Sequence, residues 1–182
     1  MIVLSDDLVT SLIKTYAFSD EIEEGGFLAG TVYRDADRPG GYLVHVTAVL
    51  PAERTGASMI NFTFTGESFL RVSQQLEKRG KDEKLLGWYH THLFAATSRL
   101  GLSSVDVELH RSTFRRPWQV AGLVNIADGH RVLRFYHGEG KQMTLVPYWA
   151  VPSRNTVPVP DTGTARTDAV QEPAPAPETE PS

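Results

Sequence analysis

The sequence predicts one α+β domain (α/β/α-like), a mixed sheet flanked by helices, followed by a short tail. Its 182 residues are 41% hydrophobic and 22% charged, the balance of a globular protein with a buried core. Residues 1–151 alternate between helical and strand periodicity, without repeats. From Pro152 onward the chain holds seven of its eleven prolines and no aromatic residue. We therefore expect a domain over 1–151 and a disordered, Pro-rich tail over 152–182.

In the first third of the chain, the expected elements follow from periodicity and capping residues. A helix is predicted over 5–17, where apolar residues recur at helical spacing behind a Ser-Asp-Asp cap. Strands are predicted over 26–34 and 41–50, because both are apolar and a turn of Asp, Pro and Gly separates them. A short alternating strand is expected over 60–65.

The remainder of the domain continues the same alternation. Two more helices are predicted, over 66–80 and over 103–114, the second stopped by Pro117. Four more strands are predicted over 84–92, 118–126, 130–137 and 142–149. The total is six or seven strands and three helices.

Composition excludes several classes of protein. A net charge of −4 and a pI near 5.8 do not indicate a nucleic-acid-binding protein. The absence of cysteine excludes a thiolate nucleophile and every sulfur-ligated zinc site. The N-terminal residues do not have the order of charged, apolar and small residues that is typical of a signal peptide. No apolar run approaches the ~20 residues that span a bilayer. We expect a cytoplasmic protein with no nucleic-acid or membrane partner.

A His-x-His pair ends the strand predicted over 84–92. Alternate residues of a strand share a face, so His90 and His92 project together while Tyr89 and Thr91 point the other way. Two neighbouring imidazoles make good metal ligands. The pair alone is also compatible with two structural histidines.

A Ser-x-x-Asp pattern follows the histidines at the start of the next helix. Ser103 and Asp106 share a helix face at this spacing, and the pattern is also that of a capping box, which needs no chemistry. Both roles are compatible, because a capped start fixes Asp106 so that it can offer a carboxylate as a third ligand. Two histidines and one carboxylate leave a position for water, as in catalytic zinc sites.

A metal-activated water also needs a general base, and carboxylates stand upstream in "EIEEGGFLAG". Glycines after these carboxylates allow another segment to approach closely. Glu21, Glu23 and Glu24 are the candidates. The alternative is a solvated acidic turn before a strand.

Together, "EEGGFLAG", "GWYHTH" and "SSVDVELH" resemble the JAMM (MPN-plus) zinc metallopeptidases in their prokaryotic, bacterial JAB branch, over about residues 20–126. The resemblance implies a JAB/MPN domain with a cytidine-deaminase-like fold, and Zn2+ as the cofactor. Its zinc ligands would be His90, His92 and Asp106. Ser103 would hydrogen-bond the substrate oxygen near the metal.

The same resemblance selects the acid/base. The family's glutamate stands three residues before a glycine that opens G-x-x-x-G, and Gly26 and Gly30 supply this pair, which indicates Glu23. Glu24 and Glu21 remain alternatives.

Family resemblance further implies a deubiquitinase-like isopeptidase or peptidase that removes or processes a ubiquitin-like protein. The protein or its conjugate would be the substrate, and E1-like or E2-like conjugation proteins would be partners. Two other functions stay open. One is a catalytically inactive MPN-type scaffold or binding module, and the other is a metal-dependent hydrolase of a different substrate.

Two features depart from the family pattern. The segment 93–102 between the second histidine and the serine has ten residues where the family has seven, and Leu93 replaces a common proline. Such a lengthened loop costs little entropy, so the strand and the helix it joins need not move. The remaining histidines are expected to be structural or on the surface, with a supporting role behind the ligands as the alternative for His110, one turn after Asp106. Trp88, Tyr89 and Trp118 are expected in the core.

Overall fold

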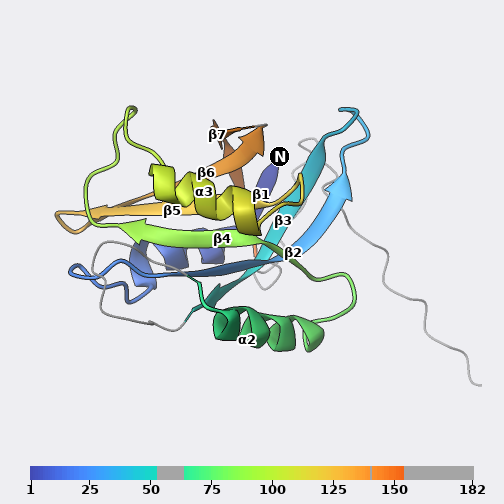
Figure 1. Ribbon diagram of the computed structural model, residues 1–182, viewed down its shortest axis with the longest axis horizontal. Helices are drawn as coiled ribbons and strands as arrows, with labels where there is room; N and C mark the ends of the chain where they lie inside the picture. Colours follow the sequence, from blue (N-terminus) through green and yellow to red (C-terminus); the bar gives the residue numbers. More distant parts are fainter. Residues whose placement is uncertain (53–63, 140, 154–182) are drawn as a thin grey trace, which may run out of the picture.

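A single curled sheet forms the framework of the molecule (Figure 1). The computed structural model describes residues 1–52, 64–139 and 141–153. Within this part the sheet has the strand order β7-β6-β5-β4-β2-β3-β1-β8. The strands are β1 (Ile2–Ser5), β2 (Gly25–Arg34), β3 (Tyr42–Pro51), β4 (Lys84–His92), β5 (Val120–Ala127), β6 (His130–Glu139), β7 (Gln142–Val146) and β8 (Tyr148–Val151).

Helices cover both faces of this sheet. The N-terminal helix α1 (Asp6–Thr10) continues into a π-helical turn, η1 (Ser11–Thr15), and packs on one face. The helices α2 (Gly66–Glu77) and α3 (Ser104–Thr113) lie over the other face (Figure 1). The mixed sheet with flanking helices confirms the predicted α+β class.

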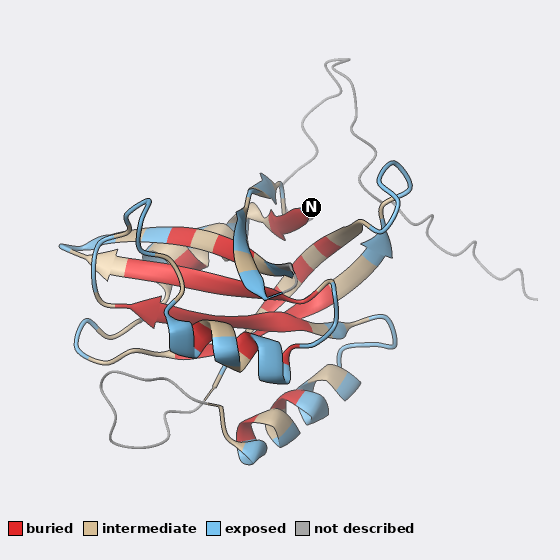
Figure 2. Ribbon diagram, turned by 45° about the horizontal axis from the view of Figure 1, so that its top comes forward, coloured by how far each residue is buried: buried red, intermediate tan, exposed pale blue. Residues whose placement is uncertain are grey.

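The core divides along the two faces of the central strands, which are the most buried part of the sheet (Figure 2). On the α2 and α3 side, Phe27 and Trp88 pack with Phe114 at the end of α3. On the α1 side, Leu28 and Tyr89 pack with Leu12 of η1. Because side chains alternate along a strand, β4 presents its residues 88, 90 and 92 to the α3 side.

The expected close approach at the start of β2 is present. Gly26 lies between β3 and β4, and a Cβ atom there would stand 2.4 Å from the carbonyl oxygen of Leu50 and 2.7 Å from the Tyr89 ring. A larger residue at this position would force β2 away from its neighbours. Gly26 thereby keeps the segment that precedes β2 close to the end of β4.

Most of the predicted elements are confirmed, and the strand 84–92 agrees at both ends with β4. The side chain of Ser5 caps the first helix, as its Ser-Asp-Asp cap predicted. Trp88 and Tyr89 are core residues, and Trp118 packs at the edge of the core.

Two predictions of strands are wrong. The short strand β1 was missed, and the strand expected over 142–149 is two strands, β7 and β8, at opposite edges of the sheet. Pro147 separates them, since proline has no N–H to continue the ladder. Residues 60–63 of the expected strand 60–65, and 154–182 of the expected tail, lie outside the described residues. Among the described helices, none has the length and apolar character needed to cross a bilayer.

Candidate metal centre

The end of β4 brings two histidine side chains together. His90 and His92 are 1% and 5% exposed, and their Nε2 atoms lie 2.9 Å apart. The pair lies on the face that α3 covers, beside the indole of Trp88, which stacks on the His90 ring at 4.6 Å between centroids. The strand alternation that the sequence predicted therefore holds at this site.

Helix α3 supplies the carboxylate. Ser103 is its N-cap and Asp106 its third residue, and the two form a capping box in which the Ser103 amide donates to Asp106 Oδ2 at 2.7 Å and the Asp106 amide donates to Ser103 Oγ at 3.2 Å. The box orients the carboxylate toward β4. Asp106 Oδ1 then lies 3.2 Å from His90 Nε2, and Oδ2 lies 3.2 Å from His92 Nε2.

For Asp106 and for His90, burial and the neighbouring side chains act on the pKa in opposite directions. Burial would raise the pKa of Asp106, but hydrogen bonds from His90 and His92 hold that pKa below its ordinary value. Burial lowers the pKa of His90, and the neighbouring Asp106 opposes this effect. The site is thus arranged around an ionised carboxylate and a neutral His90, the forms that bind a metal.

These three residues fit a divalent metal ion. In a tetrahedral site with metal–ligand distances near 2.0–2.1 Å, ligand atoms are separated by about 3.3 Å. The two Nε2 atoms lie 2.9 Å apart, and each lies 3.2 Å from one oxygen of the Asp106 carboxylate, Oδ1 for His90 and Oδ2 for His92, so each contact is close to that value. His90, His92 and Asp106 also form the one group of at least three such side chains, among the described residues, that could hold an ion. Three protein ligands leave a coordination position for a water or a substrate.

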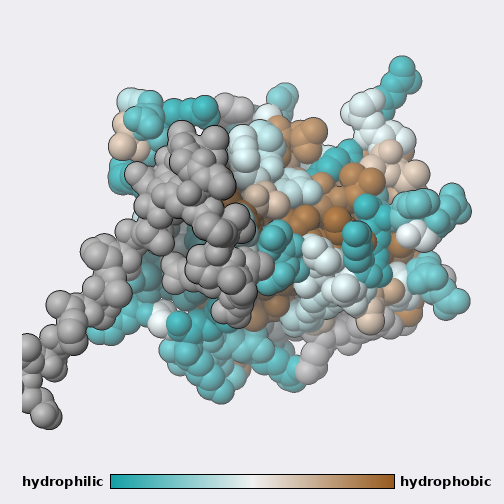
Figure 3. All heavy atoms as spheres, turned by 180° about the vertical axis from the view of Figure 1, so that it is seen from behind, coloured by the Kyte–Doolittle hydropathy of each residue, from teal (hydrophilic) through white to brown (hydrophobic). Residues whose placement is uncertain are grey.

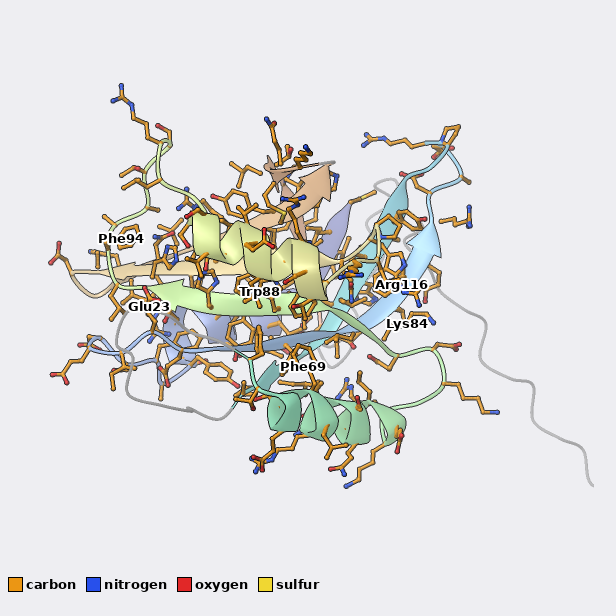
Figure 4. The ribbon with its side chains drawn as sticks, in the orientation of Figure 1. Glu23, Phe69, Lys84, Trp88, Phe94 and Arg116 are labelled. Atoms are coloured by element: carbon orange, nitrogen blue, oxygen red, sulfur yellow. The ribbon has the colours of Figure 1, made fainter. Side chains whose placement is uncertain are left out.

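Glu23 faces this group, and the strand register explains why. Gly25 pairs with His90, and Glu24 continues the pairing because its carbonyl accepts from the Thr91 amide at 2.8 Å. Glu23 is therefore on the histidine side of the sheet. Burial raises the pKa of Glu23, nearby His92 lowers it, and Asp106 raises it further. Figure 4 shows Glu23 at the end of β4.

The two alternative glutamates occupy different environments. Glu24 lies on the opposite side of the sheet, where its Oε2 accepts a hydrogen bond from the Ser19 amide at 2.6 Å and its charge acts on Tyr89. Glu21 is exposed, and its amide donates to Ser19 Oγ at 3.1 Å. Glu23 lies near enough to the ligand candidates for the charges of His92 and Asp106 to act on the pKa of its carboxyl group.

The hydroxyl of Ser103 is available for a second interaction. Its oxygen accepts the Asp106 amide, which leaves its proton free to donate elsewhere, and the residue is exposed. Ser103 also shares its capping box with Asp106, which is a metal-ligand candidate. It can therefore hydrogen-bond an oxygen held at the centre without giving up its role as a cap.

His110 lies behind the ligands and interacts with them through Trp88. The indole Nε1 donates to His110 Nδ1 at 3.1 Å, so the imidazole fixes the ring that stacks on His90. Burial, with repulsion from His137, lowers the pKa of His110 to about 4. A neutral His110 is the form that accepts the indole proton.

Sequence reasoning missed two polar residues beside the site. Asn125 is buried in β5 directly opposite His92, and it hydrogen-bonds Arg134 of β6 at 2.7 Å. The sequence offered a signal for Asn125, because it is the single polar residue in the apolar stretch "VAGLVNIA". Nothing in the sequence near Arg134 indicates its partner.

The fold and this centre define a mixed α+β domain with a buried two-histidine, one-aspartate site, and comparisons place it in a family. A family model described as JAB1/Mov34/MPN/PAD-1 ubiquitin protease matches residues 1–116. The chain belongs to this JAB family, whose members include hydrolases, as the sequence resemblance predicted.

Other comparisons concern the fold. The solution structure of protein DSY2949 from Desulfitobacterium hafniense is similar to this chain, with a TM-score of 0.60 and 17% sequence identity over 84% of this chain and 94% of that one. At this identity the likeness supports a shared fold. No curated protein matches the chain.

Proposed function

We propose that this protein is a zinc-dependent peptidase or isopeptidase that cleaves after a ubiquitin-like protein in the cytoplasm. The observation that carries the proposal is the placement of Glu23 against a buried His90–His92–Asp106 group. A site that served only to hold a structural ion would not need a partly buried carboxylate facing its ligands. The family description, a ubiquitin protease, supports the choice of substrate.

Each residue has a defined task in this reaction. A zinc ion held by His90, His92 and Asp106 would supply Lewis-acid chemistry, polarising a carbonyl and acidifying water. Glu23 accepts the proton of the attacking water and delivers it to the leaving amine, and its raised pKa suits a group that must both take and release a proton. Ser103 donates a hydrogen bond from its hydroxyl to the carbonyl oxygen, on which negative charge develops.

The proposed substrate is a ubiquitin-like protein or its conjugate, and E1-like or E2-like conjugation proteins are proposed as functional partners. The site lies at the end of β4 with Phe94 beside it (Figure 4). An extended C-terminal tail is the part of a ubiquitin-like protein that can present a peptide bond to such a site.

The test uses Glu23→Gln, with Glu24→Gln as a matched control on the neighbouring residue. The probes are a fluorogenic ubiquitin C-terminal amide and ubiquitin-like proteins with a C-terminal extension. We expect Glu23→Gln to retain bound zinc and the fold while hydrolysis falls by about 10²-fold or more. Glu24→Gln should stay active. Full activity in Glu23→Gln would exclude it as the base.

Metal content of the wild-type protein and of His92→Ala decides between enzyme and scaffold. Stoichiometric zinc in the wild type, lost in the variant, is the expected result. A wild-type protein that binds no metal under zinc-replete conditions and cleaves none of the probes would favour the inactive scaffold or binding module.

A further inference from the structure

Segment 93–102, which joins β4 to α3, forms one border of the metal centre. It contains no helix or strand, yet it begins against a ligand, since the Phe94 ring lies 5.0 Å from that of His92. Two of its large apolar side chains, Phe94 and Leu100, are 42% and 54% exposed. Phe94 therefore offers apolar surface beside the site, and Leu100 adds exposed apolar surface later in the same segment.

Asn125 attaches the start of this segment to the sheet. It is 1% exposed and lies in register with His92 on the adjacent parallel strand. Its Nδ2 donates to the carbonyl oxygen of Phe94 at 3.1 Å, and its Oδ1 accepts from Arg134 Nη2 at 2.7 Å. One amide thus joins the loop to a charged group on the next strand.

Arg134 attaches the remainder of the segment. Its Nη1 donates to the Thr97 carbonyl at 2.9 Å and its Nη2 to the Leu100 carbonyl at 2.8 Å. Together with Asn125 it holds three backbone carbonyls of one loop, and hydrogen bonds from a charged donor are the stronger kind. Gly101 packs against the Tyr136 hydroxyl so closely that a Cβ would lie 2.6 Å from it.

We propose that Asn125 and Arg134 are positioning residues that form a clamp, and that the clamp holds segment 93–102 as a fixed wall beside the site where substrate binds. The wall presents Phe94 and Leu100 to an extended peptide with an apolar side chain near the scissile bond. The fixed conformation of the loop does not depend on the proposed function, whereas the role of its apolar side chains in substrate binding does.

Hydrogen exchange of the full-length protein tests the clamp directly. In Arg134→Gln, the amides of 93–102 should exchange at least tenfold faster than in the wild type, while β4 peptides and zinc content stay unchanged. Arg134→Lys is the conservative variant, and it should restore part of the protection. Arg131→Gln is the matched control, because Arg131 lies on the same strand but contacts Leu12 and Phe18.

Asn125→Asp separates the two halves of the clamp. The variant keeps an acceptor for Arg134 but loses the donor to Phe94, so exchange should rise near Phe94 and stay slow near Leu100. Unchanged exchange throughout 93–102 in both Arg134→Gln and Asn125→Asp would overturn the clamp.

Kinetics on the fluorogenic ubiquitin amide test the role of the wall in substrate binding. Arg134→Gln and Phe94→Ala should raise KM several-fold and change kcat by less than twofold. A fall in kcat with an unchanged KM would overturn a role in positioning substrate. If the wild type hydrolyses no probe, the proposed function fails, and the exchange comparison still decides whether the clamp exists.

Discussion

Ser103 has an observed role as a helix cap and a proposed role as an oxyanion donor, and one set of substitutions can separate the two. Its Oγ caps α3 by accepting the Asp106 amide at 3.2 Å, and its free proton is proposed to stabilise the developing oxyanion. Loss of an N-cap oxygen costs about 1 kcal/mol of stability, whereas loss of an oxyanion donor costs roughly 3–4 kcal/mol of transition-state stabilisation. Ser103→Ala should therefore lower the free energy of unfolding by about 1 kcal/mol and kcat by about 10²–10³-fold.

Ser103→Gly distinguishes the cap from the donor. Glycine is nearly as good an N-cap as serine, so its unfolding free energy should lie close to that of the wild type, but it has no side-chain donor at this position. Ser103→Thr retains both groups and should retain most of both properties. Unfolding is measured in urea by tryptophan fluorescence, to which the buried Trp88 contributes, and hydrolysis with the fluorogenic ubiquitin amide, both with zinc present.

Two results would contradict this account of Ser103. If Ser103→Ala unfolds with the same free energy as the wild type, then the capping hydrogen bond contributes nothing to stability. If Ser103→Gly hydrolyses the substrate as fast as the wild type, then the hydroxyl is not the oxyanion donor. A combined loss of zinc and activity in Ser103→Ala would instead show that the cap acts by orienting Asp106.

Two further predictions concern stability. Because the folded pKa of His110 is about 4 and an unfolded histidine titrates near 6.5, the unfolded state binds more protons between these values. Stability from this group is complete above pH 6.5 and is lost as the pH falls toward 4, by at most roughly 3 kcal/mol. Metal-free His110→Leu should lose less stability than the wild type over this window in urea titrations, and parallel losses would contradict the assignment. Gly87→Ala should destabilise the chain by about 4 kcal/mol or more, since Gly87 has φ of +150° and a Cβ there would lie 1.8 Å from the Val120 carbonyl oxygen. Gly66→Ala, where a Cβ meets no atom within 4 Å, is the control, and an equal thermal shift in both variants would refute the steric explanation.

Local patterns in the sequence predicted much of the fold and the placement of the two histidines on one face of a strand. The strand 84–92 was predictable because an apolar run ends in alternating histidines. The helix after Ser103 was predictable because its capping box is contained in four residues. The grouping of Asp106 with His90 and His92 was implied by the family resemblance, and the structure places the three side chains in contact.

Features that depend on register or on distant contacts could not be predicted in this way. Whether Glu23 or Glu24 faces the histidines depends on Gly25 pairing with His90, and a shift by one residue would exchange the two glutamates. The Arg134 bonds to the loop join residues more than thirty positions apart. No local periodicity reports such a contact.

The strand order determines when the sheet can finish forming during synthesis. β1 is the first strand in the sequence, yet it lies between β3 and the last strand, β8, and is parallel to both. During synthesis one edge of β1 therefore stays unpaired until residues 148–151 have emerged, almost the whole length of the domain later. A chain cut after Val146 would keep the candidate metal ligands but leave an apolar strand edge, Ile2 to Leu4, open to pairing with other copies. The final strand thus protects the first from aggregation, although neither strand contributes to the metal centre.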